Sequence, residues 1–405
     1  MSHLEKILIT INSVIYLLLA VFSYAYVDLN LTLSQNPLLL HFVGAMQRLG
    51  YYHRPEATII FIFIVLFAYS FFGVNLLLLQ KKKIGKKFVL ISTVFNTLVL
   101  VFAYPLLSYD IFNYIFDTKI IAYYHLNPYT HSALDFPSDT WIRFMRWTHR
   151  YSPYGPFWLT LSLFPYILGF GKFILTLFAF KIFIGTFHLL NTYIIYNILQ
   201  RTKPSITLIG TATYSLNPLF LMEGVTNAHN DIVLATFLLM SVFFLVCRKT
   251  LHSFGSLVLG ILVKYIPLLV LPWNILYFYN PKTFSISRLI ALNLITMAIF
   301  TYLFSSFKIS VPFVSSGATQ IQFQPWYLFW TLPLVALIPG FWLILVSIAL
   351  SVGASLRYLP YLYYGDWSHQ GVTTFMTLVT VIPPALVITA AAFLKVTSYS
   401  RNHGK

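Results

Sequence analysis

Residues 57–87 read ATIIFIFIVLFAYSFFGVNLLLLQKKKIGKK, and this stretch decides the class of fold. Residues 57–80 contain no Asp, Glu, Lys or Arg, and a helix needs only about 20 apolar residues to cross a bilayer. Five lysines follow within residues 81–87, and short loops rich in lysine stay on the cytoplasmic side of a membrane. The stretch therefore predicts one membrane-spanning helix that ends in a cytoplasmic loop.

Apolar stretches of similar length recur along the whole chain. Of the 405 residues, 58% are hydrophobic and only 9% are charged, whereas soluble proteins carry about 25% charged residues. This composition excludes a secreted disulfide scaffold, a disordered chain and a nucleic-acid module. We expect an all-α, polytopic membrane bundle of about 10–13 transmembrane helices, forming a single domain over residues 1–405. The candidate segments are 7–27, 57–80, 88–107, 173–199, 205–221, 232–247, 255–279, 288–305, 326–349 and 371–394, with a short extra one at 157–170.

The net charge of +16 is better explained by membrane topology than by binding to nucleic acid, because the basic residues gather beside apolar stretches. In that position they also attract anionic lipid headgroups. If the lysine loop is cytoplasmic, residues 28–56, 108–156 and 222–231 lie on the outer face. For this alternation to hold, 157–170 must lie in the interface or re-enter the membrane without crossing it. Prolines interrupt the stretches at 255–279 and 326–364, so the number of spans in the later half stays open.

The polar stretch 108–156 is the predicted outer catalytic loop. It holds four of the ten acidic residues of the chain, and catalytic groups concentrate on loops. Within it, Asp110, Asn113, Tyr114 and Asp117 are spaced to share one face of a helix whose other face is apolar. This pattern predicts a helix lying in the membrane interface with its carboxylates toward water or a cleft. The alternative for Asp110 is a simple helix cap.

A second interfacial helix is predicted over residues 139–150, where three arginines alternate with Trp141, Phe144 and Trp147. Guanidinium groups match phosphate oxygens, although attraction to lipid headgroups would also explain them. The stretch 152–158 then forms a rigid entry into the next apolar segment and includes Tyr154. The arginines are Arg143, Arg146 and Arg150.

Three further groups of polar residues lie at or inside later spans. His229, Asn230 and Asp231 begin a predicted span, where they could bind sugar hydroxyls or phosphate, or cap the helix. No other His or Cys shows a matching ligand spacing, so we predict no metal site. Lys264 lies within an apolar stretch, and an ionisable residue at that depth indicates a functional site unless it extends to the interface. The third group opens a span and fits an aromatic belt or a binding loop: Gln324, Trp326 and Tyr327.

In their order and spacing, these motifs resemble the C-type, membrane-embedded glycosyltransferases, and especially the prokaryotic mannosyltransferases of the DUF2029-like group, which act on lipid-linked mannose. The resemblance covers roughly residues 100–330. It implies the prokaryotic cytoplasmic membrane, an active site on its outer face, a polyprenyl-phosphate sugar donor, and an acidic general base that maps onto Asp110. Two features depart from some relatives: no Asp-x-Asp pair surrounds Asp110, and two spans precede the one that leads into the catalytic loop. The motifs that carry the resemblance are Ser108-Tyr109-Asp110, Asn127-Pro128-Tyr129, Tyr154-Gly155-Pro156-Phe157-Trp158, Asn217-Pro218 with His229-Asn230-Asp231, Lys264 with Pro267, and Gln324-Pro325-Trp326-Tyr327.

The chemistry of such a transfer fits these residues. A polyprenyl phosphate is already a good leaving group, so neither a nucleotide-binding motif nor a cofactor is needed, and the chain has no G-x-G-x-x-G or P-loop sequence. We predict one inverting displacement that moves a single sugar, mannose by resemblance, to a hydroxyl of a glycolipid, glycan or protein. Asp110 is the base, the three arginines and Lys264 contact the phosphate, and residues 229–231 orient the donor or the base. A polysaccharide polymerase or ligase and a lipid or solute transporter are the alternatives; the chain lacks the two similar halves typical of transporters.

Overall fold

The computed structural model describes residues 1–280, 284–306 and 323–403. Within these ranges all regular structure is helical, which confirms the all-α prediction. The sixteen α-helices are α1 (His3–Ser23), α2 (Pro37–Gln47), α3 (Arg54–Gln80), α4 (Lys86–Val101), α5 (Asp110–Ala122), α6 (Pro156–Ile167), α7 (Phe173–Thr202), α8 (Thr207–Ser215), α9 (Asp231–Val246), α10 (Thr250–Val263), α11 (Leu271–Tyr279), α12 (Ile286–Ser306), α13 (Leu332–Leu337), α14 (Phe341–Leu356), α15 (Leu359–Tyr364) and α16 (Val372–His403).

Five helical segments of the described chain are long and apolar enough to cross a membrane: His3–Tyr26, Arg54–Gln80, Phe173–Thr202, Phe341–Tyr364 and Val372–Lys395. A sixth is possible if the π-helical segment η6 (Phe220–Thr226) and α9 form one broken span. The protein is therefore a multi-pass membrane protein, but helices of full spanning length are fewer than the 10–13 expected from the sequence.

The smaller number has a local cause, because several apolar stretches are divided. The stretch 255–279 becomes α10 and α11, with an extended backbone at Lys264 and the short helix η7 (Ile266–Val270) between them. Pro339 and Gly340 separate α13 from α14. The α6 helix has 12 residues and is about 18 Å long at about 1.5 Å per residue, too short for a hydrocarbon layer of about 30 Å.

Two clusters of buried apolar residues form the core. One joins α5, α7, α9 and α13, and the other joins α1, α3, α4 and α8. The η6 segment belongs to both, because Phe220 packs in the first cluster while Leu221, Met222 and Val225 pack in the second. The polar side chains of η6 and of the turn after it are thereby held at the centre of the molecule.

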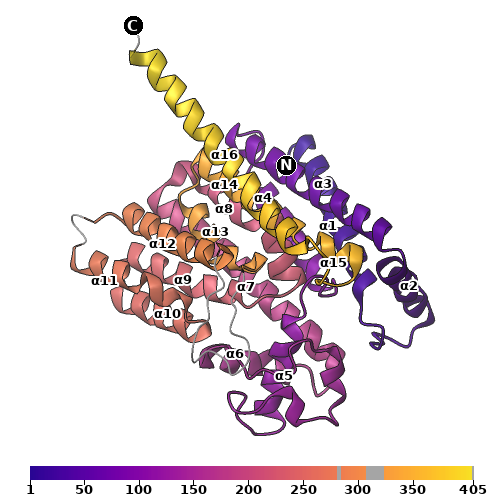
Figure 1. The fold of residues 1–405 in the computed structure, drawn as a ribbon. Coiled ribbons are helices and arrows are strands. Elements are labelled where there is room, and N and C mark those ends of the chain that lie inside the picture. The colour runs from indigo at the N-terminus through magenta and orange to yellow at the C-terminus, as the bar shows by residue number, and fades with distance from the viewer. Residues whose placement is uncertain (281–283, 307–322, 404–405) are drawn as a thin grey trace.

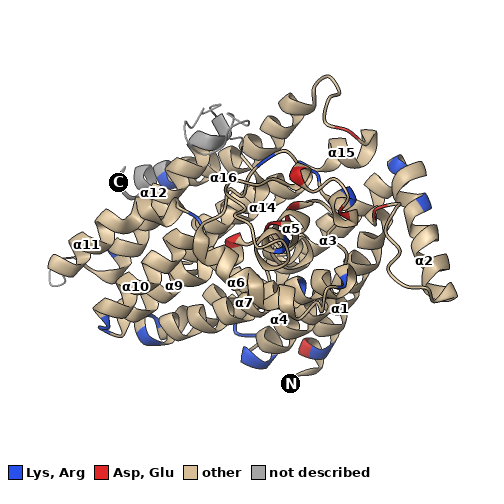
Figure 2. Cartoon of the chain, turned by 90° about the horizontal axis from the view of Figure 1, so that it is seen from below, with Lys and Arg blue, Asp and Glu red and all other residues tan. Residues whose placement is uncertain are grey.

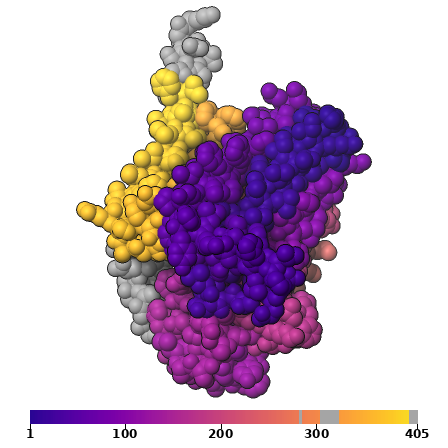
Figure 3. Space-filling view, turned by 90° about the vertical axis from the view of Figure 1, so that its right-hand side faces the viewer, coloured from indigo at the N-terminus to yellow at the C-terminus, as the bar shows by residue number. Residues whose placement is uncertain are grey.

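The loop after α4, with α5 inside it, occupies one end of the protein, and the last turns of α16 occupy the opposite end (Figure 1). Figure 2 looks onto the α5 end, where acidic residues gather around α5. Figure 3 shows the N-terminal helices covering one side of the molecule, with the chain that follows α4 below them. The predicted catalytic loop therefore forms one end of the molecule, apart from the long helices.

The helix predicted over 108–117 exists as α5, but the one predicted over 139–150 is wrong. There the chain forms only the short 3-10 helix η4 (Thr140–Phe144) and then a series of turns. Asp139 accepts the backbone N–H of Trp141 and pairs with Lys119 of α5, with 2.6 Å between Nζ and Oδ2. The Lys119 ammonium also lies 3.9 Å from the centre of the Trp141 ring. These contacts with α5 replace the regular helix that the residue spacing indicated.

Candidate active site

Asp110 is the first residue of α5, and its carboxylate does not cap the helix. The N-cap position is Tyr109, without any side-chain capping bond. Asp110 Oδ2 instead lies 3.7 Å from Nδ1 of His229, and the side chain is 13% exposed. Because the carboxylate is partly open to solvent and does not serve the helix end, it is available to act on a ligand.

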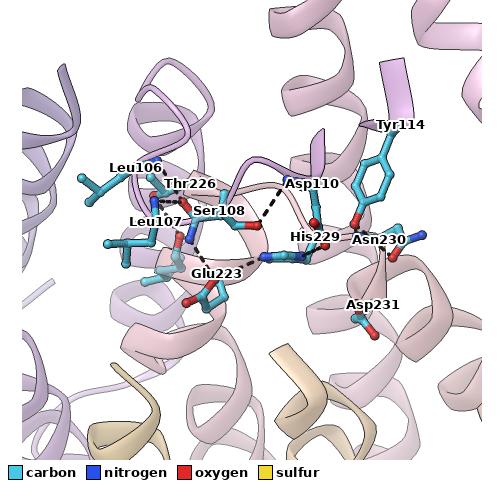
Figure 4. Close-up of polar contacts among 12 residues, drawn as sticks. Leu106, Leu107, Ser108, Asp110, Tyr114, Glu223, Thr226, His229, Asn230 and Asp231 are labelled. Carbon is cyan, nitrogen blue, oxygen red and sulfur yellow. Dashed lines mark hydrogen bonds and ion pairs between the residues drawn. The ribbon is translucent and has the colours of Figure 1, made fainter. Parts of the chain in front are cut away.

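The chain that leads into α5 is fixed to the other half of the site by Asn227. The Asn227 side-chain oxygen accepts the backbone N–H groups of Leu106 and Leu107, both at 3.0 Å. Its amide nitrogen donates to Oε2 of Glu223 at 2.8 Å. Figure 4 shows Leu106, Leu107 and Glu223 beside Asp110 and His229. One buried asparagine therefore sets where Asp110 stands relative to His229.

A sharp bend of 111° between η6 and α9 presents the second group of polar residues. The two elements pack closely at Gly224, where an added Cβ would lie 2.2 Å from Ile232 Cδ1. Ala228 in the turn has φ +57°, a left-handed conformation that costs roughly 1–2 kcal/mol for an L-residue. The three residues that follow are fully buried: His229, Asn230 and Asp231. No side-chain cap is present at the start of α9, so the capping alternative for Asn230 and Asp231 is not supported.

His229 stands between two carboxylates. Its Nε2 lies 3.4 Å from Oε2 of Glu223, opposite the Nδ1 that faces Asp110. Trp326 stacks on the imidazole, with ring centroids 3.9 Å apart and an interplanar angle of 19°. Sequence analysis did not select Glu223, although an acidic residue six positions before a His-Asn-Asp run, in a chain with ten acids, was a usable signal.

Asp231 and Lys264 form a buried ion pair. Lys264 Nζ donates to Asp231 Oδ2 at 2.8 Å, and Trp330 Nε1 donates to Oδ1 at 2.8 Å. The lysine side chain keeps 19% of its surface exposed, whereas that of Asp231 has none. Lys264 is therefore not an isolated cation in an apolar stretch, and Trp330 is a second residue that sequence analysis missed.

The segment Pro325–Trp330 (η8) forms an aromatic wall of the site. Trp326 covers His229, and Tyr327 stacks on Trp330 with ring centroids 4.3 Å apart. Gln324 is half-buried at the N-cap of η8, without a side-chain capping bond. The structure thus brings Trp326 and Tyr327 to the site, as expected for a binding loop, and leaves Gln324 at its edge.

The remaining predicted residues of α5 line its buried side. Tyr114 donates to Oδ1 of Asn230 at 3.3 Å, and Asn113 donates to the carbonyl oxygen of Trp147 at 3.2 Å. Both faces of the helix are covered by protein, from Ile111 to Ile120, so α5 does not expose a polar face to water as expected. Burial raises the pKa of Asp117 to about 7, against the opposing effects of Ser152 and Arg150.

Of the three arginines, only Arg150 interacts electrostatically with both Asp110 and Asp117 of α5. It donates to the hydroxyl of Tyr154 at 3.3 Å. Burial alone would lower its pKa, but nearby groups hold it above its ordinary value, chiefly Tyr154, Asp110 and Asp117. Arg146 is exposed and lies over the Tyr109 ring at 4.7 Å, and Arg143 is exposed without a hydrogen bond or ion pair to the described chain.

This arrangement places the partly exposed Asp110 carboxylate near Arg150, with aromatic rings along one side. Lys264 lies 5.9 Å from the centre of the Tyr154 ring, whose hydroxyl accepts from Arg150. Such a site can remove a proton from a hydroxyl and stabilise a departing anion. In the part of the chain that the structure describes, no group of three or more His, Cys, Asp and Glu side chains could hold a metal ion. The chemistry that the geometry supports is group transfer by acid–base and electrostatic catalysis.

Comparison with known proteins identifies the family. Residues 13–280, about two thirds of the chain, match the family model described as "Alpha-(1->6)-mannopyranosyltransferase, N-terminal domain". The match includes Asp110, the bend at 223–231 and Lys264. No curated protein and no solved structure matches the chain. The match confirms the resemblance drawn from the sequence and favours an enzyme over the transporter alternative. The chain belongs to the alpha-(1→6)-mannopyranosyltransferase family and is a membrane mannosyltransferase.

Proposed function

We propose that the protein transfers one mannose from a polyprenyl-phosphate donor to the 6-hydroxyl of an acceptor sugar, on the outer face of the membrane, with Asp110 as the general base. The proposal is carried by the placement of the Asp110 carboxylate. This carboxylate is partly exposed, whereas the side chains of His229 and Glu223, which lie next to it in turn, are buried. The loop 108–156 then serves as the outer catalytic loop.

The reaction is a single displacement at the anomeric carbon. Asp110 accepts the proton of the acceptor hydroxyl while that oxygen attacks the sugar. The bond from the anomeric carbon to the phosphate oxygen breaks, and its electron pair leaves with the polyprenyl phosphate. One displacement inverts the anomeric centre, so an α-linked product requires a β-linked donor.

Arg150 and Lys264, which both lie close to Tyr154, are suited to the phosphate. Arginine and lysine stabilise the negative charge that develops on a leaving phosphate, and they do so best in a site that excludes water. Lys264 is held in place by Asp231, which Trp330 fixes in turn. Arg150 is fixed by Tyr154. The exposed Arg143 and Arg146 are better suited to contact lipid headgroups at the membrane surface.

The sugar is placed by aromatic and amide groups. The half-buried rings of Trp326 and Tyr327 offer apolar surfaces to the faces of a sugar ring, and Asn230 retains a side-chain nitrogen without a hydrogen bond. The α5 side adds Asp117, whose Oδ2 also lacks a partner. Buried polar atoms without partners are costly, and bound hydroxyl groups would satisfy them.

The test uses purified enzyme with three radiolabelled donors: β-linked polyprenyl-phosphate mannose, its α-linked anomer, and a nucleotide mannose. The acceptors are an α-mannoside and the matched 6-deoxy-α-mannoside, which lacks the attacking hydroxyl. We expect transfer only from the β-linked lipid donor to the intact mannoside, in the presence of a chelator. Transfer from the nucleotide sugar alone, or to the 6-deoxy acceptor, would contradict the proposal. Loss of activity with chelator and recovery with a divalent ion would contradict the metal-free mechanism.

A further inference from the structure

We propose that Glu223 is a positioning residue that holds His229 as an imidazolium beside Asp110, and that this buried cation keeps Asp110 in the carboxylate form that can accept a proton. The inference rests on the proposed role of Asp110 as the base. The contacts in Figure 4 carry the argument: Glu223, His229 and Asp110 lie in a row across the bend between η6 and α9.

Each nitrogen of the His229 ring faces a carboxylate, at 3.7 Å for Asp110 and 3.4 Å for Glu223. A neutral imidazole has one N–H and would turn a lone pair toward one of the two acids, whereas an imidazolium offers N–H groups to both. Neither ring nitrogen forms a hydrogen bond, so the two contacts are close charge pairings and not hydrogen bonds. Stacking against Trp326 holds the ring plane, so the imidazole cannot easily rotate away from this position.

Glu223 is the group that needs the positive charge. Its side chain is 1% exposed, and Asn227 is its hydrogen-bond partner. Among the described residues, no lysine or arginine forms an ion pair with it. A buried carboxylate without a counter-charge is strongly disfavoured, so a protonated His229 is the available counter-ion.

The other titratable groups near this row come from several elements. Tyr114 of α5, Arg150 and Tyr154 of the outer loop, Tyr327 of η8, and Tyr358 between α14 and α15 interact electrostatically with Asp110. Glu223 faces Tyr69 of α3 and again Tyr358. The tyrosines are neutral near neutral pH. Apart from His229, Arg150 is the cation of this set, and it is shared with Asp117 and is partly exposed.

The experiment compares Glu223→Gln with wild-type enzyme. Glutamine keeps a side-chain oxygen that can accept from Asn227, so the anchor of Leu106 and Leu107 is preserved. His229 loses its buried counter-ion and becomes neutral, and Asp110 then loses the neighbouring positive charge. Because an adjacent cation favours the charged carboxylate, its loss should move the acid limb of the kcat/KM profile to higher pH, by about one unit or more. An acid limb that stays in place would overturn the inference.

Asn227→Ala is the matched control. It removes the anchor of residues 106–107 without changing charge, so it should lower kcat and thermal stability while the acid limb stays where it is. A shift of the limb in Asn227→Ala as large as in Glu223→Gln would mean that geometry, and not charge, controls Asp110, and would overturn the inference.

A second measurement does not depend on activity. In ¹⁵N-histidine NMR spectra near pH 7, the His229 signals, assigned by comparison with His229→Asn, should be those of an imidazolium in wild-type enzyme and of a neutral ring in Glu223→Gln. A neutral ring in the wild-type enzyme would refute the role of Glu223 and leave the transferase proposal intact. Conversely, a well-folded Asp110→Asn enzyme with full activity would refute the base, whatever the NMR spectra show.

Discussion

Asp110 and Asp117 lie two turns apart on α5, and the structure gives them different surroundings. Asp110 is partly exposed beside His229, whereas Asp117 is buried beside Ser152 and Arg150. Asp110→Asn should slow transfer by about 100-fold or more, because a general base is lost. Asp117→Asn should cost clearly less, because one displacement needs only one base. Both predictions are checked by initial transfer rates, with monodisperse elution in detergent as the folding control. A well-folded Asp110→Asn enzyme with near wild-type rate would show that Asp110 is not the base, and Asp231 would be the next candidate.

Asp117 should also make stability depend on pH. Its pKa is about 7 in the folded protein, raised by burial from the ordinary value of 3.8, so the folded state binds a proton that the unfolded state releases. The stabilisation from this proton is complete below about pH 4 and is lost as pH rises through about 7. Melting temperature should therefore fall less between these pH values in Asp117→Asn than in wild type. Equal pH dependence in the two proteins would show that Asp117 does not titrate in this range.

The sequence identified Asp110, Asp231 and Lys264 as functional candidates because charged residues are rare in so apolar a chain. It did not reveal Trp330 as the partner of Asp231, or Glu223 as the acid on the far side of His229 from Asp110. Both pairings join residues of different elements or cross the bend, and no periodic spacing within one helix reports such contacts. Residue type thus indicates that a group is functional, whereas its partner depends on tertiary structure.

At the scale of elements, the approach of residues 154–156 to the end of α10 depends on Gly155. Its backbone N–H donates to the carbonyl of Val263 at 3.1 Å, and an added Cβ would lie 2.1 Å from the carbonyl oxygen of Leu262. Gly155→Ala should push the 108–156 loop away from Lys264, destabilise the protein by about 1–3 kcal/mol, and lower kcat. Melting temperature and transfer rate are the measurements.

Gly73→Ala is the control for that substitution. Gly73 lies within α3 and nothing lies within 4 Å of an added Cβ, so alanine there should leave activity unchanged and stability equal or slightly higher. If both glycine variants behave alike, the close approach at Gly155 is not what holds the loop.

Long, continuously apolar helices were predicted well, and α3 and α7 match their segments closely. The segment 139–150 was predicted wrongly. Its arginine spacing suggested a helix, but Asp139 and Trp141 instead contact Lys119 of α5. Short amphipathic stretches are decided by such tertiary contacts, which outweigh local preference. In the stretch 255–279, the helix breaks at Lys264, where the backbone is extended and the side chain pairs with Asp231 across the site.

For the whole molecule, the orientation in the membrane is open to a direct test. The lysines at 81–87 indicate a cytoplasmic loop, and the outer loop should lie on the other side. In a background with Cys247 replaced by serine, a cysteine at Ser138, which is exposed, should react with an impermeant thiol reagent in intact cells. A cysteine at Gly85 should react only after the cells are opened. The reverse pattern would place Asp110 on the cytoplasmic side and remove the case for an outer-face donor.

The residues of the site are synthesised at well-separated times. Asp110 and Trp330 are separated by about 220 residues of chain, and the bend at 223–231 lies between them. At about 5–20 residues per second, the ribosome needs on the order of 10–40 s to pass from the first to the last. Over the last 99 residues of that stretch, Asp231 lacks the indole that fixes it, and His229 lacks the Trp326 ring that covers it. The growing chain thus receives Asp110 early and the aromatic wall late, so the complete site forms only after η8 has been inserted.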